Sequence, residues 1–97
     1  LYVHDCAAGL IRAAEEYSSP EPVNLGSGQE IAIRDLVALI VKLTGYQGQV
    51  VWDTSRPDGQ PRRCLDTSRA EQAFGFTAQT NLIEGLQTTI QDYLAGN

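Results

Sequence analysis

The apolar positions of the first half of the chain follow the spacing of two amphipathic helices. Behind Asp5, which can cap a helix, apolar residues recur every three or four positions until "SSPEP" ends the pattern; they are Ala7, Leu10, Ile11, Ala14 and Tyr17. A second helix is predicted over 33–43, with Ala32 as a poor N-cap and Gly45 as the C-terminal cap. Its expected inward face consists of Ile33, Leu36, Val37, Ile40 and Leu43.

Two more helices are predicted in the last third of the chain. Asp66 can cap a short helix that ends near Phe74, with Gly75 as its stop. The "NLIE" stretch resembles a capping box, in which the Asn81 side chain bonds forward and Glu84 reaches back. The helix that it opens is expected to turn five residues inward: Leu82, Leu86, Ile90, Tyr93 and Leu94.

Three short segments have the composition of strands: 1–3, 22–25 and 49–53. Short strands that alternate with helices indicate an α/β protein, or an α+β arrangement for an isolated piece of this size. We therefore expect a mostly helical fold with a few short strands. At 97 residues the chain is long enough for one domain.

Charge and composition exclude several functional classes. The net charge of -5 argues against general binding to nucleic acid, which depends on many Lys and Arg. No apolar run approaches the roughly 20 residues that a membrane span needs. The two cysteines, Cys6 and Cys64, are too few for a disulfide framework and form no metal-binding pattern. We interpret them as free thiols of a cytoplasmic protein.

The usual catalytic templates are missing from the sequence. "GSGQEI" lacks the third glycine of a dinucleotide fingerprint and is interpreted as a strand-to-helix turn. None of the tyrosines is followed four residues later by lysine. His4 could act as a base oriented by Asp5, or it is simply a polar residue at the end of a strand. We expect no catalytic, cofactor-binding or metal-binding residue in this chain.

An arginine-rich loop, "TSRPDGQPRRC" (residues 54–64), is the one candidate binding site. Three of the seven Lys and Arg residues gather there: Arg56, Arg62 and Arg63. Pro57, Asp58 and Gly59 suit successive positions of a β-turn. Guanidinium groups pair with phosphate oxygens and a carboxylate accepts from hydroxyls, so the loop suits a ligand that carries both groups. Alternatively, it is a solvated loop whose arginines pair with Asp53, Asp58 and Asp66.

The order of these motifs resembles the C-terminal part of GDP-L-fucose synthases, which are extended short-chain dehydrogenases/reductases. The resemblance runs nearly from end to end. It depends on "VNLGSG", "SRPDGQPRR", "LDTSR" and "NLIEGLQTTIQDYL", in this order and with natural spacing.

The resemblance implies that residues 1–97 form a single C-terminal substrate-binding domain and that an N-terminal Rossmann domain, absent here, binds NADP(H). The parent would be an oxidoreductase and epimerase that converts GDP-4-keto-6-deoxy-mannose to GDP-L-fucose. This piece alone is expected to be inactive, because the NADPH-binding domain is not part of it. The parent is expected to be a cytoplasmic homodimer that binds neither nucleic acid nor a membrane.

The resemblance also implies which residues contact the GDP-sugar. Asp58 comes first, then Arg56 and Arg63, with Arg62 and Gly59 as lesser contacts to the GDP-sugar. Residues 24–26 match a turn next to the nucleotide pocket and are expected to act as scaffold.

Departures from the family pattern limit what is inherited. The family's catalytic Ser, Tyr and Lys and its acid/base Cys and His belong upstream of Leu1, so Cys6, Cys64 and His4 inherit no role. Arg56 stands where many members have Lys. Two alternatives stay open: the C-terminal domain of an epimerase or dehydratase that uses UDP- or dTDP-sugars, and a binding module without a catalytic partner.

Overall fold

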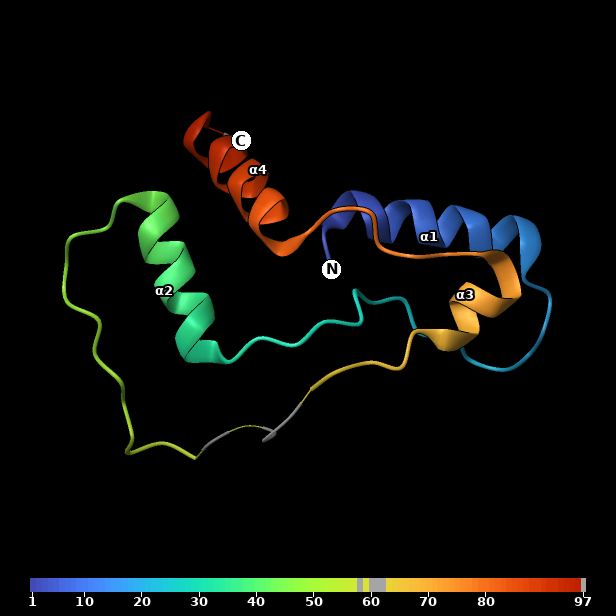
Figure 1. Ribbon diagram of the computed structural model, residues 1–97, viewed down its shortest axis with the longest axis horizontal. Helices are drawn as coiled ribbons and strands as arrows, with labels where there is room; N and C mark the ends of the chain where they lie inside the picture. The colour runs from blue at the N-terminus through green and yellow to red at the C-terminus, as the bar shows by residue number, and fades with distance from the viewer. Residues whose placement is uncertain (58, 60–62, 97) are drawn as a thin grey trace.

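The described part of the chain consists of four helices joined by long extended segments (Figure 1). The structure, a computed structural model, describes residues 1–57, 59 and 63–96. The helices are α1 (Val3–Glu16), α2 (Ile33–Thr44), α3 (Ser68–Phe74) and α4 (Leu82–Leu94). None of them is long and apolar enough to cross a membrane, in the part of the chain that is described. The prediction of a mostly helical fold is therefore confirmed.

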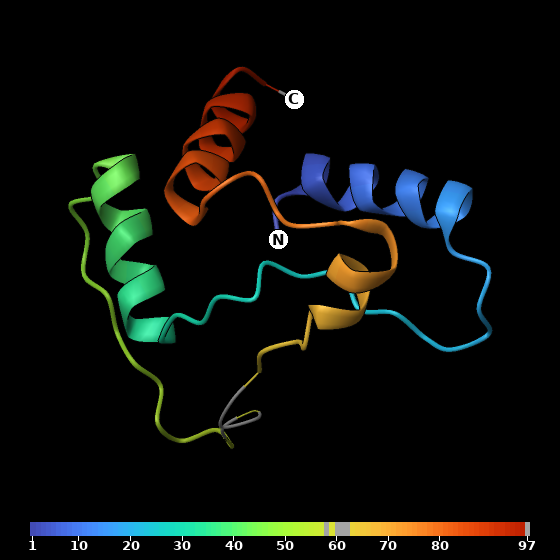
Figure 2. The same ribbon diagram turned by 45° about the vertical axis from the view of Figure 1, so that its right-hand side comes forward.

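The helices pack in two pairs, α1 with α3 and α2 with α4 (Figure 1, Figure 2). The resulting shape is open, with extents of 49 × 35 × 18 Å and a radius of gyration of 16.5 Å. A compact domain of this length has a radius of gyration of about 13 Å. The accessible surface of 7882 Å² likewise exceeds the roughly 5,500 Å² of a folded protein of this mass.

The core is a small cluster around α3. Ala70, Phe74 and Phe76 are its buried members. The Phe74 ring meets the Tyr17 ring edge to face, with 5.8 Å between the ring centroids. Partly buried side chains complete the cluster: Ala13, Tyr17, Val23 and Leu25. The cluster thus joins α1, α3 and the segment around residues 23–25.

The buried face of α1 differs from the predicted one. Leu10 and Ile11 are 59% and 60% exposed, whereas Asp5 and Gly9 are buried. A Cβ atom at Gly9 would lie 3.0 Å from side-chain atoms of Leu25 and Phe76, so the missing side chain allows a close approach. Asp5 and Gly9 therefore face the core together with Tyr17, whereas Leu10 and Ile11, on which the prediction also depended, point away from it.

Asp5 is not the helix cap that the sequence suggested. Helix α1 begins at Val3, inside the segment predicted as a strand, and Tyr2 is its N-cap. Asp5 lies in the first turn, where Oδ2 accepts a hydrogen bond from the Thr80 backbone N–H (2.9 Å). Asp5 thus connects α1 to the segment that precedes α4.

The expected ends of the other helices are largely confirmed. Ala32 is the N-cap of α2, and Gly45 and Gly75 take left-handed conformations, with φ of 69° and 65°, after α2 and α3. Asn81 Oδ1 accepts from the Glu84 backbone N–H (2.8 Å), which is the forward half of the capping box. The N-cap of α3 is Thr67 rather than Asp66, whose carboxylate instead accepts from the Ser68 N–H (2.9 Å).

The inward faces predicted for α2 and α4 are only partly correct. No residue of α2 is fully buried, and Ile33 and Ile40 are exposed. In α4, Leu86 and Ile90 are half-buried, but Tyr93 and Leu94 are exposed. Both helices lie at the open side of the molecule and present apolar residues to solvent.

None of the three predicted strands is present among the described residues. A strand needs a neighbour that pairs its backbone N–H and C=O groups. Segment 22–25 contributes instead through its side chains Val23 and Leu25, which pack against the cluster, and through the Pro22 carbonyl, which accepts a hydrogen bond from Arg69. β-Branched composition alone therefore does not identify a strand here.

The close approach at Gly9 predicts the effect of a larger side chain. Gly9→Val should lower the free energy of unfolding by about 1–3 kcal/mol, because its methyl groups would overlap Leu25 and Phe76. Ala8→Val, on the exposed side of α1, is the matched control and should cost less than about 0.7 kcal/mol. Urea unfolding followed by circular dichroism measures both, and equal losses would contradict the packing described for α1.

Candidate functional site

The described residues of the arginine-rich loop, 54–57, 59, 63 and 64, lie at the margin of the molecule, between the segment that follows α2 and the start of α3 (Figure 1). Of the five predicted site residues, the structure describes Arg56, Gly59 and Arg63. Asp58 and Arg62 lie outside the described residues. Arg63 is exposed, and a Cβ atom placed on Gly59 would have no atom within 4 Å. The described part of the loop is therefore open to a ligand.

Arg56 is oriented by Asp53. Its Nε lies 3.4 Å from Asp53 Oδ2, and its side chain stays 84% exposed. Asp53 Oδ1 accepts hydrogen bonds from the hydroxyl and the backbone N–H of Ser55. These bonds, the hydroxyl first, hold the pKa of Asp53 below its ordinary value, with a smaller contribution from Arg56. The solvated-loop alternative correctly anticipated the pair between an arginine and Asp53.

The loop is followed by a segment that contacts residues 22–28. Asn24 Nδ2 donates to the Asp66 carbonyl oxygen at 3.4 Å. Gly26, expected to be scaffold, lies against Leu65 and Thr67. The structure thus brings the "VNLGSG" turn next to the end of the arginine-rich loop, although the two are about 40 residues apart in sequence.

Like Asp53, Asp66 accepts a hydrogen bond from the backbone N–H of a serine two residues later. Its Oδ1 accepts a 2.9 Å hydrogen bond from the Ser68 backbone N–H. This bond is the main cause that lowers the pKa of Asp66, followed by the Ser68 hydroxyl and then by the positive charge of Arg69. Both ends of the loop therefore carry an ionised aspartate at neutral pH.

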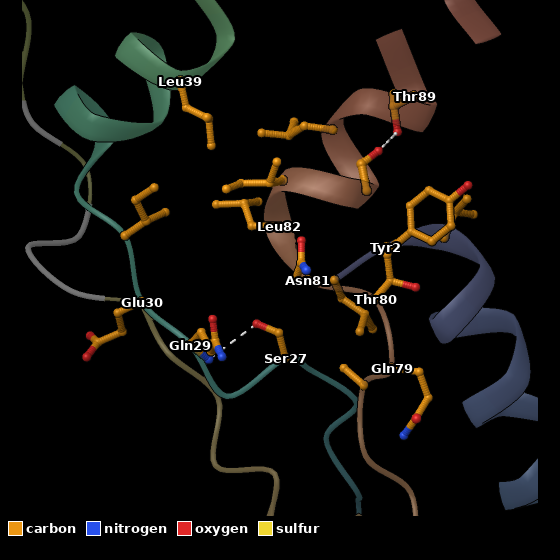
Figure 3. A pocket seen from close by; sticks show the side chains of 17 residues that line it. Tyr2, Ser27, Gln29, Glu30, Leu39, Gln79, Thr80, Asn81, Leu82 and Thr89 are labelled. Carbon is orange, nitrogen blue, oxygen red and sulfur yellow. Dashed lines mark hydrogen bonds between the residues drawn. The ribbon is translucent and has the colours of Figure 1, made fainter. Parts of the chain in front are cut away.

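A cavity of about 890 Å³ lies elsewhere and was missed by the sequence analysis (Figure 3). It is bounded by the start of α1, residues 27–31, residues 78–83 and α4. Polar side chains that line it include Ser27, Gln29, Glu30 and Asn81, and its other walls are largely apolar, including Tyr2 and Leu82. The left-handed Gly28 (φ 74°) and the Asn81 cap were the sequence signals beside it. Arg56, Gly59 and Arg63, the predicted site residues that the structure describes, do not line this cavity.

His4 and the cysteines form no reaction centre in the described part of the chain. The His4 ring packs edge to face on Tyr2, with the centroids 4.9 Å apart, while the Asp5 carboxylate bonds Thr80. Cys6 and Cys64 are free and half-buried. No group of three His, Cys, Asp or Glu side chains that could hold a metal ion is found among the described residues.

The sequence is similar to curated GDP-L-fucose synthases, although no protein-family model matches it. It is 39% identical to GDP-L-fucose synthase 1 of Arabidopsis thaliana over 94 residues, which are 97% of this chain and 29% of the relative. The GDP-L-fucose synthase of Escherichia coli K12 is 39% identical over 103 residues, covering 97% of this chain and 32% of that protein. The chain spans less than a third of the length of these relatives.

Two solved structures share the fold. The Bordetella bronchiseptica enzyme WbmF, in complex with NADH, is 31% identical with a TM-score of 0.80 over 96% of this chain and 28% of that one. RMD from Pseudomonas aeruginosa, complexed with NADPH, has a TM-score of 0.84 at 24% identity, over 96% of this chain and 30% of that one. The resemblance to GDP-L-fucose synthases and to the fold of extended short-chain dehydrogenases/reductases is thereby confirmed.

The hydrogen bonds of Asp53 and Asp66 predict that alanine variants of their serine partners change the two aspartate pKa values by different amounts. Ser55→Ala removes the largest cause of the low Asp53 pKa, so the Asp53 pKa should rise toward its ordinary value. Ser68→Ala keeps the backbone N–H that dominates at Asp66, so the Asp66 pKa should rise less. Carboxyl ¹³C NMR titration of both residues measures this, and a larger rise at Asp66 would contradict it.

The same pKa values give the sign of a pH effect. Because both are lowered in the folded chain, the stabilisation by these carboxylates is present above the ordinary aspartate pKa of about 3.9. It should be lost as the pH falls through the lower values of the folded state.

Proposed function

We propose that residues 1–97 are the substrate-binding domain of a longer NADP-dependent epimerase/oxidoreductase that acts on a GDP-linked sugar. The support is sequence identity of 39% to GDP-L-fucose synthases over nearly the whole chain, together with the arginine-rich loop. The reaction would be the conversion of GDP-4-keto-6-deoxy-mannose to GDP-L-fucose, by epimerisation followed by hydride transfer from NADPH. In this proposal the chain binds the substrate and does not carry the catalytic residues.

The exposed guanidinium of Arg56 carries the site proposal. Asp53 holds its Nε side, and the exposed side chain can offer its terminal N–H groups to a diphosphate. Arg63 adds positive charge on the same loop. Asp58, with Arg62 and Gly59, completes the proposed contacts, in which the Asp58 carboxylate accepts from ligand hydroxyls.

NADP(H) would be held by a Rossmann domain outside this chain. Gln29 and Glu30 of the "GSGQEI" turn line a cavity, and the turn lacks the third glycine of the dinucleotide fingerprint. The residues present therefore do not fit the dinucleotide, and this chain's part is to hold and orient the sugar nucleotide. The parent would be a cytoplasmic homodimer.

The exposed surface supports the presence of a partner domain. The accessible area exceeds that of a compact protein of this mass by roughly 2,400 Å², more than a standard interface of about 1,600 Å² buries. Apolar side chains contribute to it on α1, α4 and the segment after α2; they include Leu10, Ile11, Val51, Tyr93 and Leu94. We propose that the Rossmann domain of the same parent chain covers part of this surface.

A UDP-sugar enzyme is the second candidate. The structure of WbmF in complex with NAD⁺ and UDP is 32% identical over 96% of this chain and shows that a similar protein holds a uridine nucleotide. An arginine-rich loop recognises the diphosphate in either case and does not distinguish the bases. The third alternative, a module without a catalytic partner, predicts that no glycine-rich fingerprint or Tyr-x-x-x-Lys motif is encoded upstream of Leu1.

The loop proposal predicts a selective loss of substrate affinity. In the full-length parent, Arg56→Ala and Asp58→Ala should each raise the Kd for the GDP-sugar about tenfold or more, since each removes a charge-assisted hydrogen bond. NADPH affinity should stay unchanged. Arg34→Ala is the matched control, because Arg34 is equally exposed on α2.

Calorimetric titration measures both affinities. Unchanged GDP-sugar binding in both loop variants would refute the proposed site. In the same assay, GDP- and UDP-sugars should be compared with the unmodified parent; tighter binding of the UDP-sugar would favour the second candidate.

The proposal of a partner domain predicts that a variant in α1 behaves differently in the isolated chain and in the full-length parent. Ile11→Asp should hardly change the unfolding of the isolated chain, because the side chain is largely exposed there. In the full-length parent it should lower the melting temperature by several degrees, since a charge would be buried in the interface. Equal effects in the two proteins would contradict a domain interface at this face.

A further inference from the structure

We propose that the contact between residues 22–28 and residues 65–69, called the clasp below, positions the end of the arginine-rich loop for substrate binding. This inference rests on the proposed function, because it concerns the geometry of that site. No part of the clasp lies in the proposed ligand contacts themselves. Its residues would act through the loop and not on the ligand.

Two side chains connect the segments of the clasp across more than 40 residues of sequence. Asn24 Nδ2 donates to the Asp66 backbone carbonyl at 3.4 Å. In the opposite direction, the Arg69 guanidinium donates to the Pro22 backbone carbonyl. Each bond joins a side chain of one segment to the backbone of the other, so the two segments are held in one register.

Gly26 allows the backbones to come close. A Cβ atom there would lie 3.4 Å from Cβ and Cδ1 of Leu65 and from Cγ2 of Thr67. That distance leaves room for one methyl group but not for a branched side chain. Gly26 does not have a positive φ, in contrast to Gly28, so a substitution at Gly26 changes the available space without imposing backbone strain.

The clasp lies directly beside the proposed site. Arg63 is two residues before Leu65, and two residues of extended chain span at most about 7 Å. On the other side, Asp66 accepts from the Ser68 N–H at the start of α3, and Ala70 and Phe74 of α3 are buried in the core. The core thereby fixes the position of α3. Helix α3 and the clasp together fix the position of Leu65, and this limits where Arg63 can lie.

Three variants of the full-length parent separate positioning from folding. Gly26→Val should displace residues 65–67, and Asn24→Asp, which has the same shape, places a carboxylate against the Asp66 carbonyl. Both should raise KM for the GDP-sugar about tenfold, the change expected when one loop contact is lost. Gly26→Ala is the matched control and should stay within twofold.

The kinetic pattern distinguishes this role from a general loss of structure. At saturating GDP-sugar, kcat and the KM for NADPH should stay within twofold of the unmodified enzyme, with an unchanged melting temperature. If kcat or NADPH affinity falls together with the melting temperature, the positioning role is overturned. Asn24→Asp provides the test if Gly26→Val does not fold.

Arg56→Ala, measured alongside, separates the two proposals. If it raises KM for the GDP-sugar while Gly26→Val and Asn24→Asp do not, the clasp inference alone is wrong. If Arg56→Ala, Gly26→Val and Asn24→Asp all leave KM for the GDP-sugar unchanged, the proposed function of the loop fails, and the clasp inference fails with it.

Discussion

The packing of Phe74 against α1 is the interaction on which the rest of the described structure depends. Phe74 meets Tyr17 edge to face, and Ala70 and Phe76 complete the buried cluster. The cluster joins three stretches of chain, and no sheet connects them among the residues that the structure describes. It also fixes α3, and α3 begins only a few residues after the arginine-rich loop. The position of the proposed binding loop therefore depends on a core made by a handful of side chains.

This small core explains why the molecule is open. Helix α2 has no fully buried residue, and the apolar residues Leu10 and Ile11 of α1 point away from the cluster. Burial of apolar surface is the main favourable term in folding, so exposed apolar faces on several helices are typical of a piece that packs against a further surface. We propose the NADPH-binding domain as that surface. Substrate binding and domain docking would then use different faces of the same chain.

The sequence predicted those features that depend on local chemistry. Glycines in left-handed conformation end α2 and α3, and Asn81 caps α4, because these preferences depend on a few neighbouring residues. The buried face of α1 could not be predicted in this way. It depends on Gly9, whose lack of a side chain allows Leu25 and Phe76 to approach, and hydrophobic periodicity gives little weight to a glycine.

Features that depend on distant residues were predicted poorly. Segments 22–25 and 49–53 have the composition of strands, but a strand forms only where a partner pairs its backbone. The contact between Asn24 and Asp66 and the cavity beside Ser27 both bring together residues far apart in sequence. For the site itself, the sequence identified the loop and the pairing with Asp53, whereas the positions of Asp58 and Arg62 lie outside the described residues.

Hydrogen–deuterium exchange of the full-length parent, with and without a GDP-sugar, tests the binding role of the arginine-rich loop most directly. If the loop binds the substrate, peptides that cover residues 54–65 should exchange more slowly in the presence of the ligand. Protection limited to the cavity segments 27–31 and 78–83, with unchanged exchange over 54–65, would contradict a binding role for the loop.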